Sequence, residues 1–180
     1  DLDIVLLNAF NGINDYKMFP FGILREPVKC IRRADFVIFT KDNLINPKSE
    51  VSHLVGKYIN DNVFYSSYKL EKISSDSSKD NFNKNKVIAV SGVGDPHSFE
   101  LSLLKENVNM LYHFKFRDHH NYNQADINNI AKASKKMNAL SIVTTEKDYV
   151  KLKKLDISKI DLKFFIAVSY THLRAHETSD

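Results

Sequence analysis

The sequence has one cysteine, no large excess of either charge and no long apolar segment. Because a disulfide needs two cysteines, and a zinc site built on cysteine needs several, the single Cys30 excludes both. No run approaches the roughly 18–20 apolar residues of a transmembrane helix. Lysine and arginine total 26 against 22 acidic residues, and the basic residues are scattered, so no nucleic-acid-binding stripe is indicated. These absences fit a protein of a reducing compartment that does not bind nucleic acid.

Apolar runs of strand length recur along the chain. Those at residues 3–7, 36–39 and 87–90 predict buried strands, and those at 140–144 and 162–168 predict two further strands. Residues 108–116 alternate between apolar and polar and predict another strand. Helix-start signals, a proline or a capping residue, lie between the runs at Pro27, Asp95, Asn123 and Thr145. This alternation of strands and helices predicts an α/β fold whose parallel sheet is covered on both faces.

The ends of the chain differ from its middle. The sequence opens on Asp1 inside a strand pattern, without an initiating methionine, which indicates an N-terminally truncated piece of a longer protein. Residues 169–180 break the pattern and look like translated adapter sequence, so we expect a non-native tail. His172 and His176 in this tail have the spacing of two metal ligands on a helix. No third ligand has a defined spacing, so no metal site is predicted there.

Four short segments concentrate the side chains that could bind or react. They are residues 24–27 (LREP), 91–96 (SGVGDP), 118–120 (DHH) and 144–148 (TTEKD). In the first, the guanidinium of Arg25 is suited to phosphate and the carboxylate of Glu26 to Mg²⁺. Alternatively, both residues only decorate a helix start, where a carboxylate is favoured by the helix dipole.

The other segments also allow two readings. Residues 91–96 present backbone N–H groups to an anion, or form a tight strand-to-helix turn. They lack the third glycine of a dinucleotide site and the lysine of a P-loop. Asp118, His119 and His120 offer proton transfer or metal ligation, or else a polar helix entry with one buried imidazole. In residues 144–148, capping explains Thr145 and Asp148, while Lys147 is placed to meet an anion or a carboxylate.

The ordered set of segments resembles the C-terminal half of the tetraacyldisaccharide 4′-kinases, the lipid A 4′-kinases. The match rests on residues 19–27, 33–35, 91–96, 118–122 with Asp126, and 144–148, in the family's order and at about its spacing. It implies a parallel-sheet, P-loop-kinase-like remnant followed by a smaller α/β/α C-terminal domain. We expect residues 1–58 to end the kinase domain, and residues 59–168 to form the smaller domain.

The resemblance implies transfer of the γ-phosphoryl of ATP, with Mg²⁺, to the 4′-hydroxyl of a lipid-linked disaccharide, the lipid A precursor. This chemistry takes place at the cytoplasmic face of the bacterial inner membrane. Arg25 and Glu26 are implied to lie near the nucleotide, with Glu26 at the metal. His119 is implied to be catalytic, as the partner of an aspartate from the missing half, with Asp118 as its support.

In that family the P-loop, a paired-aspartate segment and a membrane-facing helix come before the point where this chain begins. The chain is therefore expected to be inactive alone, and peripheral membrane contact is expected from the missing half. Arg117 stands where many members have proline, which changes no assignment. Asn8 stands where an aspartate is common, and residues 11–14 match the family's Gly/Asn-rich loop only loosely, so residues 8–18 receive no roles. Two alternatives stay open: a metal-dependent phosphoesterase that uses the Asp-His-His cluster, and a non-catalytic α/β module.

Overall fold

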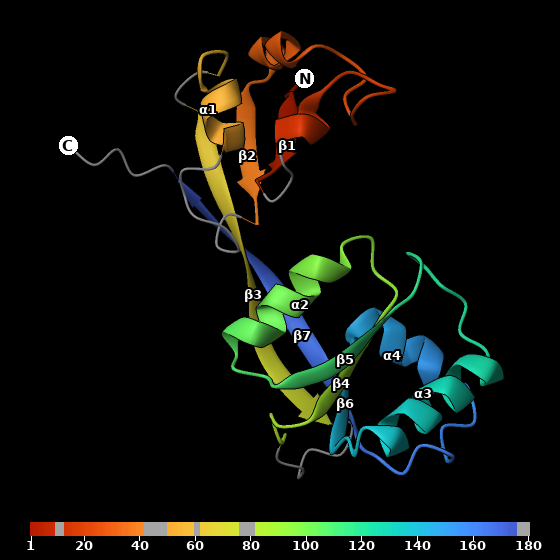
Figure 1. The fold of residues 1–180 in the computed structure, drawn as a ribbon. Coiled ribbons are helices and arrows are strands. Elements are labelled where there is room, and N and C mark those ends of the chain that lie inside the picture. Colours follow the sequence, from red (N-terminus) through yellow and green to blue (C-terminus); the bar gives the residue numbers. More distant parts are fainter. Residues whose placement is uncertain (10–12, 42–49, 60–61, 76–81, 176–180) are drawn as a thin grey trace. The chain divides into compact units, whose positions relative to one another are not determined.

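A computed structural model describes residues 1–9, 13–41, 50–59, 62–75 and 82–175 (Figure 1). The chain divides into two compact units, Asp1–Lys69 with Thr171–Asp180, and Leu70–Tyr170. The division falls inside two strands, β3 (Val63–Ser75) and β7 (Phe164–Ala175), which contribute residues to both units. Because β7 continues to Ala175, much of the stretch from residue 169 onward is strand rather than unstructured tail. That this stretch is non-native stays a prediction, as do the predicted domain boundaries.

The first unit contains a small parallel sheet. Its strands follow the order β1 (Ile4–Asn8), β2 (Phe36–Thr40) and the first part of β3. The helix expected after Pro27 is present as a short 3₁₀ helix, η2 (Val28–Arg33), which lies in the connection between the parallel strands β1 and β2. The other helices are η1 (Ile13–Tyr16) and α1 (Glu50–Gly56). The core of this unit contains Leu7, Ala9, Tyr16, Ile31, Val37, Phe39 and Val55.

The second unit is a parallel sheet with the strand order β7-β6-β4-β5. The strands not yet defined are β4 (Val87–Ser91), β5 (Met110–Lys115) and β6 (Ser141–Thr145). The helices are α2 (Pro96–Lys105), α3 (Gln124–Lys136) and α4 (Glu146–Leu152). Each strand lies where an apolar or alternating run predicts it, and β7 is longer than its run because it continues past residue 168.

The pleat of β4 separates two cores in the second unit. Ile88 and Val90 belong to the core cluster that includes residues of α3 and α4. Val87 and Ala89, which point to the opposite face, pack with residues of α2. Figure 1 shows α2 on one side of these strands and α3 with α4 on the other. The expected α/β/α layering around a parallel sheet is therefore confirmed.

The helices of the second unit begin where the capping signals predict. Asp95 accepts a hydrogen bond from the backbone N–H of Ser98 at 3.0 Å, and Asn123 and Asp126 form a complete capping box. The buried stripe of α2 contains Phe99 and Leu103, whereas the neighbouring Leu104 is 52% exposed. None of the described helices has the length and apolar character needed to cross a bilayer.

Candidate functional site

Three of the four segments meet in the second unit at the carboxyl edge of β4, β5 and β6. Asp148 accepts a hydrogen bond from the N–H of Gly92 at 2.9 Å, and the carbonyl of Gly92 accepts one from the N–H of His119 at 3.2 Å. A Cβ added at Gly94 would lie 3.3 Å from Oδ2 of Asp118. Because the carboxyl ends of parallel neighbours share one sheet edge, strand exits distant in the sequence become one site.

Asp118 and His119 form the exposed part of this site. Oδ1 of Asp118 accepts the backbone N–H of His119 at 3.0 Å, and Oδ2 lies 3.9 Å from Nε2 of the imidazole. The His119 side chain is 79% exposed, and its backbone is left-handed, with φ 57°. A histidine in this conformation is uncommon. The arrangement presents to solvent an imidazole whose neighbouring carboxylate is suited to orient it.

His120 is engaged in internal contacts instead. Its Nε2 lies 2.9 Å from Oδ2 of Asp126, and its ring stacks on Phe116 with centroids 4.6 Å apart. Its carbonyl accepts a hydrogen bond from Nζ of Lys151 at 3.0 Å. The sequence alone does not separate the two adjacent histidines, whereas the structure gives His120 the contacts of a packed, capping side chain.

Asp148, in the first turn of α4, supports the site with a buried carboxylate. Thr145 Oγ1 accepts the backbone N–H of Asp148 at 3.2 Å, as the capping spacing predicts. The reciprocal half of the predicted box is not made: Asp148 Oδ2 accepts from Thr145 Oγ1 at 2.7 Å and from the turn at Gly92. Asp148 therefore ties the 91–96 turn to α4, a role that short-range spacing does not reveal.

Gly92 packs closely against the side chains of Asp148 and Tyr122. A Cβ at Gly92 would lie 3.1 Å from both Asp148 Oδ1 and the Tyr122 hydroxyl. Both oxygens are buried, and neither has a hydrogen-bond partner within the described part of the chain. Burial, reinforced by the charge of Asp148, raises the pKa of the Tyr122 hydroxyl well above its usual range, so it stays protonated. Glycine is favoured at this position by the close approach of these groups rather than by backbone conformation.

A second polar network, missed by the sequence reasoning, lies between β4, β5 and α2. Ser91 Oγ is 2.7 Å from Nε2 of His113, and Nδ1 of His113 is 3.0 Å from Oε1 of Glu100. Lys115 and His97 also reach this carboxylate, at 2.8 and 3.3 Å. The row of serine, histidine and acid resembles a hydrolase triad. Ser91 is completely buried, so no substrate reaches its hydroxyl and the network is structural.

The electrostatics of this network follow from its burial. Desolvation works against the charge of Glu100, but hydrogen bonds from Lys115, His113 and His97 outweigh it and lower the pKa of this carboxyl to about 2. For His113, burial lowers the pKa of the imidazole below its usual value of 6.5, despite the opposing effect of Glu100. At neutral pH, Nδ1–H of a neutral His113 therefore donates to an ionised Glu100. The hydroxyl of Ser91 then donates to Nε2.

This network predicts how stability depends on pH. A lowered histidine pKa in the folded state means that the unfolded chain takes up the proton first, so the free energy of unfolding should fall as pH drops below about 6.5. Glu100 should add a second loss between its unfolded pKa of about 4.5 and its folded pKa of about 2. Urea unfolding followed by circular dichroism, from about pH 8 to pH 3, measures both.

His113→Gln serves as the control for the first loss, because glutamine does not titrate. The decline below about pH 6.5 should become smaller in this variant, while the decline at lower pH remains. An equal decline in both proteins would remove His113 as its cause.

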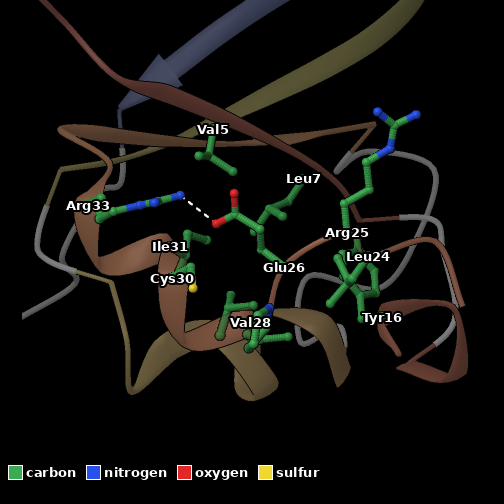
Figure 2. A pocket seen from close by; sticks show the side chains of 12 residues that line it. Val5, Leu7, Tyr16, Leu24, Arg25, Glu26, Val28, Cys30, Ile31 and Arg33 are labelled. Atoms are coloured by element: carbon green, nitrogen blue, oxygen red, sulfur yellow. Dashed lines mark hydrogen bonds and ion pairs between the residues drawn. The ribbon is translucent and has the colours of Figure 1, made fainter. Parts of the chain in front are cut away.

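The fourth segment, residues 24–27, lies in the first unit beside a cavity of about 280 Å³. Figure 2 shows the Glu26 carboxylate reaching across the cavity to Arg33, while the Arg25 guanidinium points away. The Glu26 and Arg33 side chains form an ion pair at 2.6 Å, and both are more than half exposed. Arg33 belongs to one of the segments that resemble the family, residues 33–35, but the sequence predicts no role for it. The sequence signal that could have predicted its pairing with Glu26 is their separation by seven residues across η2.

The sites contain few side chains that could bind a metal ion. Within the described ranges no group of three or more histidine, cysteine, aspartate or glutamate side chains is arranged to hold a metal ion. A phosphoesterase built on Asp118, His119 and His120 would need such a group, so that alternative is not favoured. Among the residues that the structure describes, Glu26 is the one acidic residue lining the cavity of the first unit. Of the two histidines in the predicted tail, His172 and His176, the second lies outside the described residues.

Comparison with known proteins gives consistent matches over nearly the whole chain. A sequence profile described as Tetraacyldisaccharide-1-P 4′-kinase matches residues 1–179. A tetraacyldisaccharide 4′-kinase of Bdellovibrio bacteriovorus is 36% identical over 163 residues, covering 86% of this chain and 47% of that protein. The enzyme of the same name from Halothermothrix orenii is 30% identical over 176 residues, covering 88% and 46%. The chain thus spans about half the length of the curated relatives it matches.

A solved structure agrees with the fold. The crystal structure of the "apo" form of LpxK from Aquifex aeolicus in complex with ATP matches with a TM-score of 0.56 and 22% identity. The match covers 96% of this chain and 48% of that one. At this level of identity the likeness concerns the fold alone.

Proposed function

The chain belongs to the tetraacyldisaccharide-1-P 4′-kinase family, and from this membership we propose that it is the C-terminal half of an ATP-dependent lipid A 4′-kinase. The reaction proposed is transfer of the γ-phosphoryl of ATP to the 4′-hydroxyl of the tetraacyldisaccharide precursor. The observation that carries the proposal is the meeting of three segments at one sheet edge, with the His119 imidazole exposed beside Asp118. Phosphoryl transfer relies on positioned groups rather than on protein covalent chemistry, which suits such a site.

His119 acts as the proton-handling partner of an aspartate from the nucleotide-binding half. Three features support this assignment over His120: the imidazole is exposed, Asp118 adjoins it, and its backbone is tied to the turn at Gly92. Asp118 is a positioning residue, because one of its oxygens holds the His119 backbone and the other lies near the ring. His120 and Asp126 belong to the support of the site.

Arg25 and Glu26 act at the nucleotide. Mg²⁺ in kinases is typically held by one or two protein carboxylates together with phosphate oxygens, so the single carboxylate of Glu26 fits such a site. When bound, the ion neutralises charge on the phosphates. Arg33 holds the Glu26 carboxylate in place over the cavity, and Arg25, which points away from this pair, is placed to contact phosphate. The proposed phosphoryl transfer takes place at the cytoplasmic face of the bacterial inner membrane.

The proposal is tested by following γ-labelled phosphate from ATP to tetraacyldisaccharide 1-phosphate. The complete enzyme, in which the chain is joined to its nucleotide-binding half, should label the lipid. The 180-residue chain alone should give no product, because its sequence has no P-loop to cradle the phosphates. Transfer by the chain alone would contradict the half-site assignment, and a folded complete enzyme without transfer would contradict the proposed reaction.

A further inference from the structure

The three-stranded sheet of the first unit has one face that its own helices cover. Val5 and Leu7 of β1 pack in the core on this face, and their partners in register on β2 are Val37 and Phe39. The same core contains residues of η1, η2 and α1. Because alternate residues of a strand point to opposite faces, all three helices lie against one side of the sheet.

The opposite face of this sheet is also apolar, but it is open. It consists of the side chains that are paired in register on this side of the three strands: Ile4, Leu6, Phe36, Ile38 and Phe64. We call these five residues the open face. Exposure is greatest at β1, where Ile4 is 51% and Leu6 64% exposed, whereas the three residues on β2 and β3 are half-buried. A contiguous apolar surface of this kind usually marks a contact.

The sequence of β1 is that of a strand with two covered faces. Parallel sheets are covered on both sides, and their strands therefore form continuous apolar runs. Residues 3–7 are such a run, so the sequence predicts burial on both faces. The structure buries the side of Leu7 and leaves Ile4 and Leu6 exposed, so this prediction is wrong for one face. The described residues thus lack a layer for which the strand sequence is suited.

The topology explains why the helices of the first unit do not supply this layer. β1, β2 and β3 follow one another in one direction across the sheet. Right-handed crossovers in one direction place every connection on the same face, as observed. In doubly wound sheets, helices cover the second face because further strands succeed one another in the opposite direction. Such strands can be added at β1, which lies at the end of the order of the described strands.

The outer edge of β1 indicates what kind of partner fits. In a parallel strand, alternate peptide groups point to opposite edges, so half of those in β1 point away from β2. Another strand would pair these groups, whereas the hydrocarbon of a bilayer offers them no partner. The matched relatives are about twice as long as the aligned part, of which this chain covers 47% and 46% of two of them. A second half of that length is sufficient for several strands and helices.

We propose that the open face is the docking surface for the nucleotide-binding half, which extends the sheet at the outer edge of β1 and covers Ile4 and Leu6 with the apolar side of a helix. The inference rests on the proposed function in one respect, namely that this chain is joined to such a half. It adds the surface through which the two halves of the sheet are held together.

Amide hydrogen exchange tests the proposal on unaltered proteins. Residues 4–8 should exchange at least about tenfold more slowly in the complete enzyme than in the 180-residue chain, because an added strand pairs the outer peptide groups of β1. β5 is the matched control, because it lies at the other end of the strand order and should exchange equally in both proteins. Equal exchange of residues 4–8 in both proteins, or the same slowing in β5, would overturn the proposal.

A substitution on the open face gives a second, independent test. Leu6→Asp should change the Tm of the 180-residue chain little, because the side chain is 64% exposed there. In the complete enzyme the carboxylate would enter an apolar interface, so the Tm should fall by about 5 °C or more. Leu140→Asp, at a position that is 50% exposed in the second unit, should have the same small effect in both proteins. A complete enzyme that no longer folds, beside a chain that does, would support the proposal equally.

The remaining outcomes assign the open face to another occupant. If Leu6→Asp leaves the Tm of the complete enzyme unchanged but converts a dimer into a monomer in sedimentation, a second copy covers the face. If it weakens only the binding of the complete enzyme to phosphatidylglycerol vesicles, a bilayer covers it. Either result would contradict docking of the nucleotide-binding half. Because none of these assays contains ATP or lipid acceptor, such a failure is distinguishable from a failure of phosphoryl transfer.

Discussion

Replacing His119 by alanine in the complete enzyme is expected to lower kcat by about 10²–10⁴-fold, with little change in the KM for ATP. The reason is that His119 is proposed to handle a proton of the reaction rather than to bind the nucleotide, whose contacts are assigned to Arg25 and Glu26. The side chain is 79% exposed, so its removal should not affect folding. Steady-state kinetics with varied ATP at saturating lipid acceptor measures the two parameters separately.

Two further variants make this result specific. His119→Asn keeps a residue that tolerates the left-handed backbone of this position, so it should be as slow as alanine if the imidazole itself is needed. His172→Ala alters an exposed histidine of β7, outside the sheet edge where the segments meet, and should keep full activity. A normal kcat in His119→Ala would remove this residue from the mechanism and direct attention to His120.

Asp148→Ala is expected to lower the free energy of unfolding by about 2–4 kcal/mol. The carboxylate is only 1% exposed and accepts hydrogen bonds from the N–H of Gly92 and the hydroxyl of Thr145. Its removal leaves the buried N–H of Gly92 without a partner and opens a cavity below the turn. The midpoint of urea unfolding, followed by far-ultraviolet circular dichroism, measures the loss.

The matched comparison is Asp148→Asn, which has the same shape and retains one oxygen to accept from Gly92. It should lose less stability than alanine, because the hydrogen bond across 56 residues can persist. A stability of Asp148→Ala within about 0.5 kcal/mol of the unaltered chain would show that the turn does not depend on this carboxylate.

The sequence predicted best those features that depend on near neighbours. The capping box joins Asn123 to Asp126, three positions apart, and Asp95 caps its helix by binding the N–H of Ser98, so local spacing identified both. The strands of the second unit are likewise evident from runs of apolar residues. In the first unit the helix after Pro27 was expected, but its 3₁₀ form was not, because helix-start signals do not specify the hydrogen-bond pattern.

Features made by distant residues escaped prediction. His113, Glu100 and Ser91 come from two strands and a helix, and nothing local in the sequence pairs them. Asp148 looked like a simple capping residue, because its bond to Gly92 spans 56 positions. The proposed roles of His119, Asp118, Arg25 and Glu26 remain predictions that rest on family resemblance, and the kinetics above test the first of them.

The two glycines of the 91–96 turn leave different room for sequence change. At position 92 an added Cβ would lie 3.1–3.2 Å from two buried oxygens and a backbone carbonyl, so a substitution there should act mainly through stability. At position 94 the nearest neighbour is the exposed carboxylate of Asp118, which can swing aside. A variant at Gly94 would then persist as a stable protein with a misplaced partner for His119. Natural selection should therefore act on the two positions through different properties. At position 92 it acts on the amount of folded protein, and at position 94 on the turnover of the enzyme.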